Sequence, residues 1–378
     1  SYNGKISDIS VDPTGINNLS IIAGTGGKGG VGGADFTPQT TDYKGGNGGG
    51  GGNATVHLDQ DFTFNNVTLM STGGDGGDVP NTFYGTGGNG GVGGTASLIG
   101  QGNVTATLNG ILALASNIGT DGINNGSGTA GLAGQGGNIE VAINGSLRVA
   151  SGQTATVNFS SNTTAVAERG TFNVTINNLS IEDGATFNTS TSTISDLAVS
   201  DNVSFGTIRL GSSQDGGATF NSQAISTGIS LNGANISTTG RNNTLSVNGV
   251  FTTNGGANGA TTLAFDATGL QNGDTMLTVT NGIDMAGIAQ PGQVVVYAQG
   301  NTVQAAKASH RALSGQRITL IDYSGVNIVA GSIYDNGSAP VSQYTQIGTS
   351  RFYYRPPAEN NGSGLGLVYN GHMTEYSL

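Results

Sequence analysis

The sequence contains no cysteine and no tryptophan, and only 9% of its 378 residues are charged. The absence of Cys excludes disulfide frameworks, thiolate metal sites and cysteine nucleophiles. A disordered chain of this polarity would normally carry far more charge, so the composition argues against disorder. No apolar run approaches the roughly 18 residues that would span a bilayer, so we expect no membrane insertion by this segment.

The few charges are unevenly placed, and they contain no basic stripe. The net charge is −11. Residues 1–290 hold 19 acidic and 7 basic side chains, which gives −12, and residues 291–378 hold 4 and 5, which gives +1. Without a basic stripe, nucleic acid is not an expected partner. The three histidines, His57, His310 and His372, follow no ligand spacing, so neither a metal nor a cofactor is expected.

Glycine supplies 68 positions, and short strings recur along the chain. Asn-Asn-Leu-Ser-Ile occurs at 17–21 and again at 177–181, and Gly-Ala-Thr-Phe-Asn occurs at 184–188 and 217–221. Each string alternates apolar and polar residues, as a half-buried strand does. Asn-Gly and Asp-Gly turns separate these runs. We predict an all-β chain whose equivalent strands stack as a β-solenoid, with residues 1–290 forming the solenoid and residues 291–378 a distinct closing β region that begins near 287–292.

Three glycine-rich insertions interrupt the strands, at about 24–52, 73–94 and 119–137. The first two follow a Gly-Gly-x rule on both an outgoing and a returning stretch. A three-residue period matches the polyproline-II helix, and glycine on two of its three faces lets such helices approach closely and hydrogen-bond. We therefore predict lateral excursions similar to polyglycine II; the alternative is a flexible glycine-rich linker. The third insertion departs from strict triplets, which puts its place in such a bundle in doubt.

Aromatic residues gather where the glycine stops, in the segments 35–44 and 79–84. Exposed aromatic rings beside hydroxyl and amide groups are a common way to bind a glycan or a protein. The candidate binding residues are Phe36, Thr37, Tyr43, Phe83 and Tyr84. The alternative is that these rings only close the end of a glycine bundle.

The alternating Gly/Asn/Thr-rich strands resemble the passenger domains of type V secreted autotransporters and related β-helical surface adhesins. The segments 313–325 (LSGQRITLIDYSG) and 364–369 (GLGLVY) are similar to those that close such passengers. The resemblance implies a right-handed β-helix at a Gram-negative cell surface. The chain begins at Ser1 rather than Met, and we expect a processed N-terminus.

A second resemblance concerns the Gly-Gly-x stretches, which look like the polyglycine-II bundles of some phage tail-tip adhesins and of glycine-rich antifreeze proteins. In the phage case the resemblance implies that loops at the end of the bundle recognise the host. An antifreeze surface would need a regular Thr or Ala face, and the third positions here are too varied.

We expect an extracellular structural or adhesive protein, not an enzyme, that binds a glycan or protein on a host or neighbouring cell. One alternative is a self-assembling filament subunit, since unpaired strand edges can stack copy on copy into a homopolymer. Another is a β-helical polysaccharide-degrading enzyme, for which the candidate acid pairs are Asp59 with Asp61, Glu182 with Asp183, and Asp196 with Asp201. All of these can equally be solvated carboxylates at turns. Residues 73–81 fit the calcium nonapeptide frame except at Pro80, and one imperfect copy is a weak signal.

Overall fold

The computed structural model describes residues 16–31, 43–78, 85–123, 129–163, 168–192, 201–222, 229–230, 235–247, 251–252, 261–266, 270–271, 273–280, 283–284, 294–299, 317–322, 344–347, 350–355 and 365–369. Within these ranges every regular element is a β-strand. None of the described residues forms a helix long and apolar enough to cross a membrane. The prediction of an all-β chain is confirmed.

The first twelve strands are β1 (Ile16–Ile22), β2 (Tyr43–Lys44), β3 (Ala54–Leu58), β4 (Phe62–Thr72), β5 (Gly85–Thr86), β6 (Ala96–Gly100), β7 (Thr105–Leu108), β8 (Ile111–Asn117), β9 (Ile139–Val149), β10 (Thr154–Ser160), β11 (Phe172–Ile181) and β12 (Thr186–Ser192). The next fourteen are β13 (Asn202–Leu210), β14 (Thr219–Ser222), β15 (Ile229–Ser230), β16 (Asn235–Thr239), β17 (Asn243–Val247), β18 (Phe251–Thr252), β19 (Thr261–Asp266), β20 (Thr275–Thr280), β21 (Ile283–Asp284), β22 (Val294–Gln299), β23 (Arg317–Asp322), β24 (Tyr344–Ile347), β25 (Ser350–Arg355) and β26 (Leu365–Tyr369).

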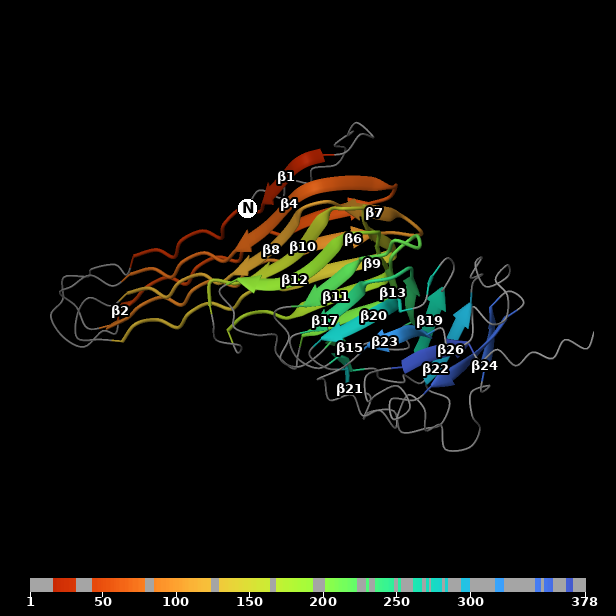
Figure 1. Ribbon diagram of the computed structural model, residues 1–378. Coiled ribbons are helices and arrows are strands. Elements are labelled where there is room, and N and C mark those ends of the chain that lie inside the picture. The colour runs from red at the N-terminus through yellow and green to blue at the C-terminus, as the bar shows by residue number, and fades with distance from the viewer. Residues whose placement is uncertain are drawn as a thin grey trace, which may run out of the picture. The chain divides into compact units, whose positions relative to one another are not determined.

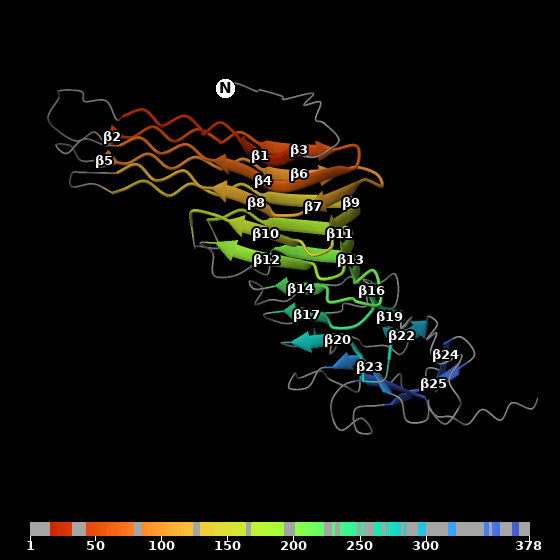
Figure 2. The same ribbon diagram turned by 45° about the horizontal axis from the view of Figure 1, so that its top comes forward.

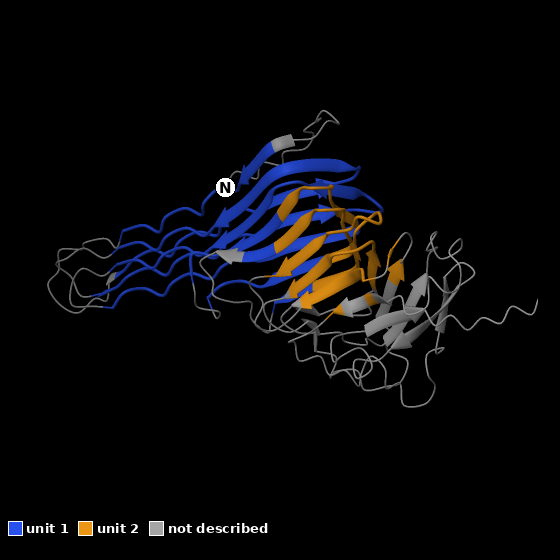
Figure 3. Ribbon diagram, in the orientation of Figure 1, with its two compact units in different colours: residues 1–145, 156–175, 189–203 blue, residues 146–155, 176–188, 204–378 orange. Residues whose placement is uncertain are grey.

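The chain divides into two compact units (Figure 3). Unit 1 comprises residues 1–145, 156–175 and 189–203, and unit 2 comprises residues 146–155, 176–188 and 204–378. In both units successive turns of chain stack by parallel strand pairing, which is the arrangement of a β-solenoid. The solenoid prediction is therefore confirmed at this level.

In unit 1, β1, β4, β8 and β10 pair in parallel in that order, and so do β3, β6 and β9 (Figure 2). The register places equivalent apolar residues above one another. Ile21 pairs with Leu69, Leu69 with Leu114, and Leu114 with Phe159. Because side chains alternate across a strand, β9 buries every second residue along its whole length, from Ile139 to Val149. The core of unit 1 is thus a set of narrow apolar columns.

In unit 2, parallel pairing links β14, β17, β20 and β23, and likewise β16, β19 and β22. A cluster of three buried rings, those of Phe187, Phe205 and Phe220, packs here with centroids 5.5 to 6.2 Å apart. After β23 the pairing changes, because β23–β26, β25–β26 and β24–β25 are antiparallel. The predicted break at 287–292 lies outside the described residues.

Candidate functional site

Six glycine-rich arms connect strands of unit 1 and run side by side toward β2 (Figures 1 and 2). The outgoing arms are residues 23–31, 73–78 and 118–123, which follow β1, β4 and β8. The return arms are residues 45–53, 87–95 and 129–138, which lead back into β3, β6 and β9. We call these six arms together the glycine lattice. None of the arm residues just given lies in a strand.

Outside the first outgoing arm, the second glycine of a lattice triplet donates its N–H to an adjacent arm. Gly49 donates to the Gly27 carbonyl at 2.7 Å, Gly74 to Gly49 at 2.8 Å, and Gly91 to Gly74 at 2.6 Å. The third insertion continues the series, although its triplets are irregular. There Gly119 donates to Gly91 at 3.1 Å and Gly134 to Gly119 at 2.9 Å.

In the first two turns, the first residue of each triplet donates in a second direction, to the equivalent arm of the next turn of chain. The Gly29 N–H donates to the Asp75 carbonyl, the Gly48 N–H to Asn89, and the Gly90 N–H to Leu132, each at 2.8 Å. Two sets of backbone hydrogen bonds therefore cross-link six arms in two directions without any side chain.

Glycine is required where arms face one another. A Cβ at Gly88 would come closer than 3.0 Å to backbone atoms of Gly46 and Gly77, and a Cβ at Gly119 would do so to Gly74 and Gly91. Real Cβ atoms do not approach backbone this closely, so the lattice spacing depends on their absence.

The third triplet positions form side-chain ladders between turns. Asn47 Oδ1 accepts the Asn89 N–H at 3.1 Å, and Asn89 Oδ1 accepts the Leu132 N–H at 2.9 Å. Asp75 Oδ1 accepts both the N–H and the hydroxyl of Thr120, at 3.0 and 2.7 Å. These positions look merely variable in the sequence; the 42- to 45-residue spacing of Asn and Asp to their partners is the signal that could have revealed them.

Two carboxylates of the second outgoing arm are held in the ionised form. Hydrogen bonds from the Thr120 hydroxyl and N–H lower the pKa of Asp75 below its ordinary value. The pKa of Asp78 is lowered by the Ile123 N–H and by Lys28, whose Nζ lies 3.1 Å from Asp78 Oδ2. Both carboxylates belong to the segment considered for calcium, and here their oxygens face N–H donors. Within the described part of the chain, no group of three His, Cys, Asp or Glu side chains could hold a metal ion.

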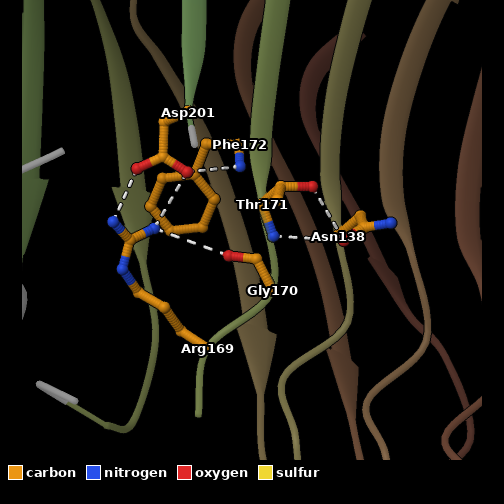
Figure 4. A network of polar contacts seen from close by, with 6 residues as sticks. All are labelled: Asn138, Arg169, Gly170, Thr171, Phe172 and Asp201. Carbon is orange, nitrogen blue, oxygen red and sulfur yellow. Dashed lines mark hydrogen bonds and ion pairs between the residues drawn. The ribbon is translucent and has the colours of Figure 1, made fainter. Parts of the chain in front are cut away.

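A buried ion pair lies where the lattice meets the next turn of chain (Figure 4). Arg169 Nη2 lies 2.5 Å from Asp201 Oδ2, and both side chains are at most 2% exposed. The guanidinium carbon also lies 4.4 Å from the ring centroid of Phe172, whose N–H donates to Asp201 Oδ1 at 2.9 Å. Next to this pair, Asn138 Oδ1 accepts from Thr171.

This pair corrects the interpretation of Asp201 as a solvated carboxylate, since Asp201 is buried and paired with Arg169. The two residues are 32 positions apart, close to the 33-residue offset of the repeated Gly-Ala-Thr-Phe-Asn string. That coincidence is the signal that could have predicted the pair.

Three of the other candidate acids, Asp61, Glu182 and Asp183, bind backbone or basic groups. Asp61 Oδ1 accepts the Thr105 N–H at 2.7 Å, and Glu182 Oε1 lies 2.6 Å from Arg148 Nε. Burial alone would raise the pKa of Asp183, but hydrogen bonds from Ser212 and Ser213 outweigh it, and the pKa is lowered. Asp196 lies outside the described residues.

Of the predicted binding residues, the structure describes only the backbone of Tyr43. It lies in β2, at the far end of the first return arm, where Tyr43 pairs in parallel with Gly85 and Lys44 with Thr86. Phe36, Thr37, Phe83 and Tyr84 lie outside the described residues, so their role in binding stays a prediction. In a comparison with known proteins, no family model, no curated protein and no solved structure matches this chain.

Proposed function

We propose that this chain is an extracellular structural or adhesive protein, in which the glycine lattice is a stiff support for the segments that join its arms. The observation that carries the proposal is the pattern of backbone hydrogen bonds in two directions across six arms. A support of this kind needs no apolar core of its own, so it can project laterally from a narrow solenoid.

The three-residue repeat of these bonds supports an assignment of the arms to polyglycine II. A polyproline-II-type helix has three residues per turn and no internal hydrogen bonds, so all its N–H groups are available to neighbours. In the proposal, six such helices extend laterally from a right-handed β-helix of the kind found in autotransporter passengers.

The proposed binding surface is the set of segments that join outgoing and return arms. Binding residues are commonly placed on loops that a rigid scaffold positions. In the sequence, the first two joining segments bring Phe36, Thr37, Tyr43, Phe83 and Tyr84 into a region otherwise poor in aromatic residues. Aromatic rings with nearby polar groups fit a glycan or a protein at a host or neighbouring cell surface.

The test is binding of the purified chain to immobilised glycans and to intact cells. Replacing Phe36, Tyr43, Phe83 and Tyr84 together by Ala is expected to weaken binding at least tenfold, about 1.4 kcal/mol. The control is Val92→Ala, which removes a 52% exposed apolar side chain from a return arm instead of a joining segment. Unchanged binding by the fourfold variant, with an unchanged circular dichroism spectrum, would refute the proposal.

A further inference from the structure

The glycine lattice ends in an upper and a lower edge, and these two edges differ in sequence. The upper edge is formed by the first outgoing and return arms, and the lower edge by the third pair of arms. At inner positions, a Cβ on the second glycine of a triplet would meet the turn above. A Cβ on the first residue would instead face the turn below, as Gly74 and Gly29 respectively show.

On the lower edge, the first triplet position is glycine only where a Cβ would clash with the next turn of chain. Beyond Ile118, the first triplet positions there are Asp121, Ala130, Ala133 and Gly136. A Cβ at Gly136 would come closer than 3.0 Å to Gly170, from the turn below. The other three positions carry side chains, so no further arm can approach them at the lattice spacing.

On the upper edge, the second triplet positions are glycine although no described residue lies close enough to exclude a side chain. Around Gly24, Gly27 and Gly30 there is nothing within 4 Å of an added Cβ. These are second triplet positions, the ones that face the preceding turn in the second and third turns of the lattice. By the rule that holds on the lower edge, Gly27 and Gly30 indicate a neighbour that is not among the residues that the structure describes.

The upper edge also presents unpaired backbone groups of both kinds. Gly74 and Gly77 donate their N–H groups to Gly49 and Gly46 of the preceding turn. The equivalent N–H groups of Gly27 and Gly30 have no acceptor among the residues that the structure describes, and the Lys28 carbonyl, equivalent to that of Asp75, receives no donor there. An edge with both donors and acceptors can pair with an identical edge.

We propose that two copies of this chain associate through the upper edge of the glycine lattice, with the arm 23–31 of one copy antiparallel to the same arm of the other. Only a glycine-lined arm fits at this spacing, and consecutive Gly-Gly-x triplets occur nowhere in the sequence outside the arms and their joining segments. Of the other arms, 45–53 already donates from Gly46 and Gly49 to the carbonyls of Gly30 and Gly27, and the arms of the second and third turns are covered on their upper side by the preceding turn. The one glycine-lined edge that a second copy offers is therefore the same edge.

A two-fold contact of this kind closes on itself, because each copy uses its single open edge. Head-to-tail stacking would bring the Cβ atoms of Asp121, Ala130 and Ala133 against the partner. The contact is short, so the dimer belongs to the small-interface, weak class and is populated only at high protein concentration. The inference depends on the lattice and not on what the joining segments bind.

The experiment is sedimentation velocity of the full chain over a concentration series. The wild type is expected to shift from monomer to dimer, and Gly27→Val with Gly30→Val is expected to abolish the dimer over the same range. The matched control is Ala130→Val with Ala133→Val, which adds similar bulk to the lower edge and is expected to leave the dimer intact. If the valine pair disturbs folding, seen as a lower melting temperature, Gly27→Ala with Gly30→Ala replaces it.

Three results would overturn the proposal: a wild type that stays monomeric throughout, a dimer that survives the upper-edge substitutions, or polymers longer than a dimer. Loss of the dimer in the lower-edge control as well would also overturn it, because the contact would then not be specific to the upper edge. Glycan and cell binding by the upper-edge variant should be unchanged at concentrations where the wild type is monomeric, which separates this proposal from the adhesive one.

Discussion

The strand columns and the glycine lattice of unit 1 lie on the same turns of chain, yet they are stabilised in opposite ways. The columns bury side chains, with Leu69, Leu114 and Phe159 in register on successive strands. The lattice buries backbone, and its inner glycines leave no space for a single Cβ. One region depends on apolar area removed from water, the other on hydrogen bonds between close-packed main chains.

The comparison shows why the two regions tolerate change differently. A column can lose a methylene group and relax in part. An arm cannot gain one, because the obstacle is a neighbouring backbone that is itself hydrogen-bonded on the far side. Substitutions that add atoms to the lattice and substitutions that remove them from the columns should therefore both destabilise, through different mechanisms.

The largest effect is expected where the two regions meet, at the buried Arg169–Asp201 pair. Asp201→Asn removes one charge, leaves the guanidinium buried without its counterion, and should lower the free energy of unfolding by about 3–5 kcal/mol. Denaturant unfolding followed by circular dichroism measures this loss. The double variant Arg169→Met with Asp201→Leu should recover much of the stability. A single variant as stable as the wild type would show that the pair contributes nothing.

The sequence was sufficient to predict the all-β solenoid, because Asn-Asn-Leu-Ser-Ile and its relatives show both the strand period and the repeat. It was not sufficient to predict the Arg169–Asp201 pair, since burial of a charge depends on the register between turns. Nor did it predict that the irregular third insertion hydrogen-bonds like the first two. In this insertion the triplet positions that face the second turn are glycine, namely Gly119, Gly122, Gly131 and Gly134. The preceding position of each of these triplets is not glycine, so only one of the two glycines that mark a triplet in the sequence is present.

A smaller effect is expected inside the lattice, where a matched pair of glycines isolates the cost of one methyl group. Gly88→Ala places a Cβ against the Gly46 carbonyl and should destabilise by about 1–3 kcal/mol, the usual cost of overpacking. Gly27→Ala adds the same methyl group where nothing lies within 4 Å. It should be neutral or stabilising by about 0.4–1 kcal/mol, because Ala restricts the unfolded chain. Equal effects at the two positions in thermal unfolding of the monomer would contradict the lattice geometry.

The smallest effect is expected at Asp75, which belongs to the lattice but acts through a side chain. Its pKa is lowered in the folded protein, so the ionised form binds Thr120 more tightly than the protonated form does. The native state therefore holds fewer protons than the unfolded state near the ordinary pKa of about 3.9. The contribution is present above that pH and is lost as the pH falls through the lowered pKa.

Since Asp75 is exposed, we expect Asp75→Asn to lower the melting temperature slightly at neutral pH and to flatten its decline below pH of about 4. Asp59→Asn is the control, because it removes the same charge from an exposed residue outside the lattice. A parallel acid limb in Asp75→Asn and wild type would mean that the ladder from Asp75 to Thr120 adds no pH-dependent stability.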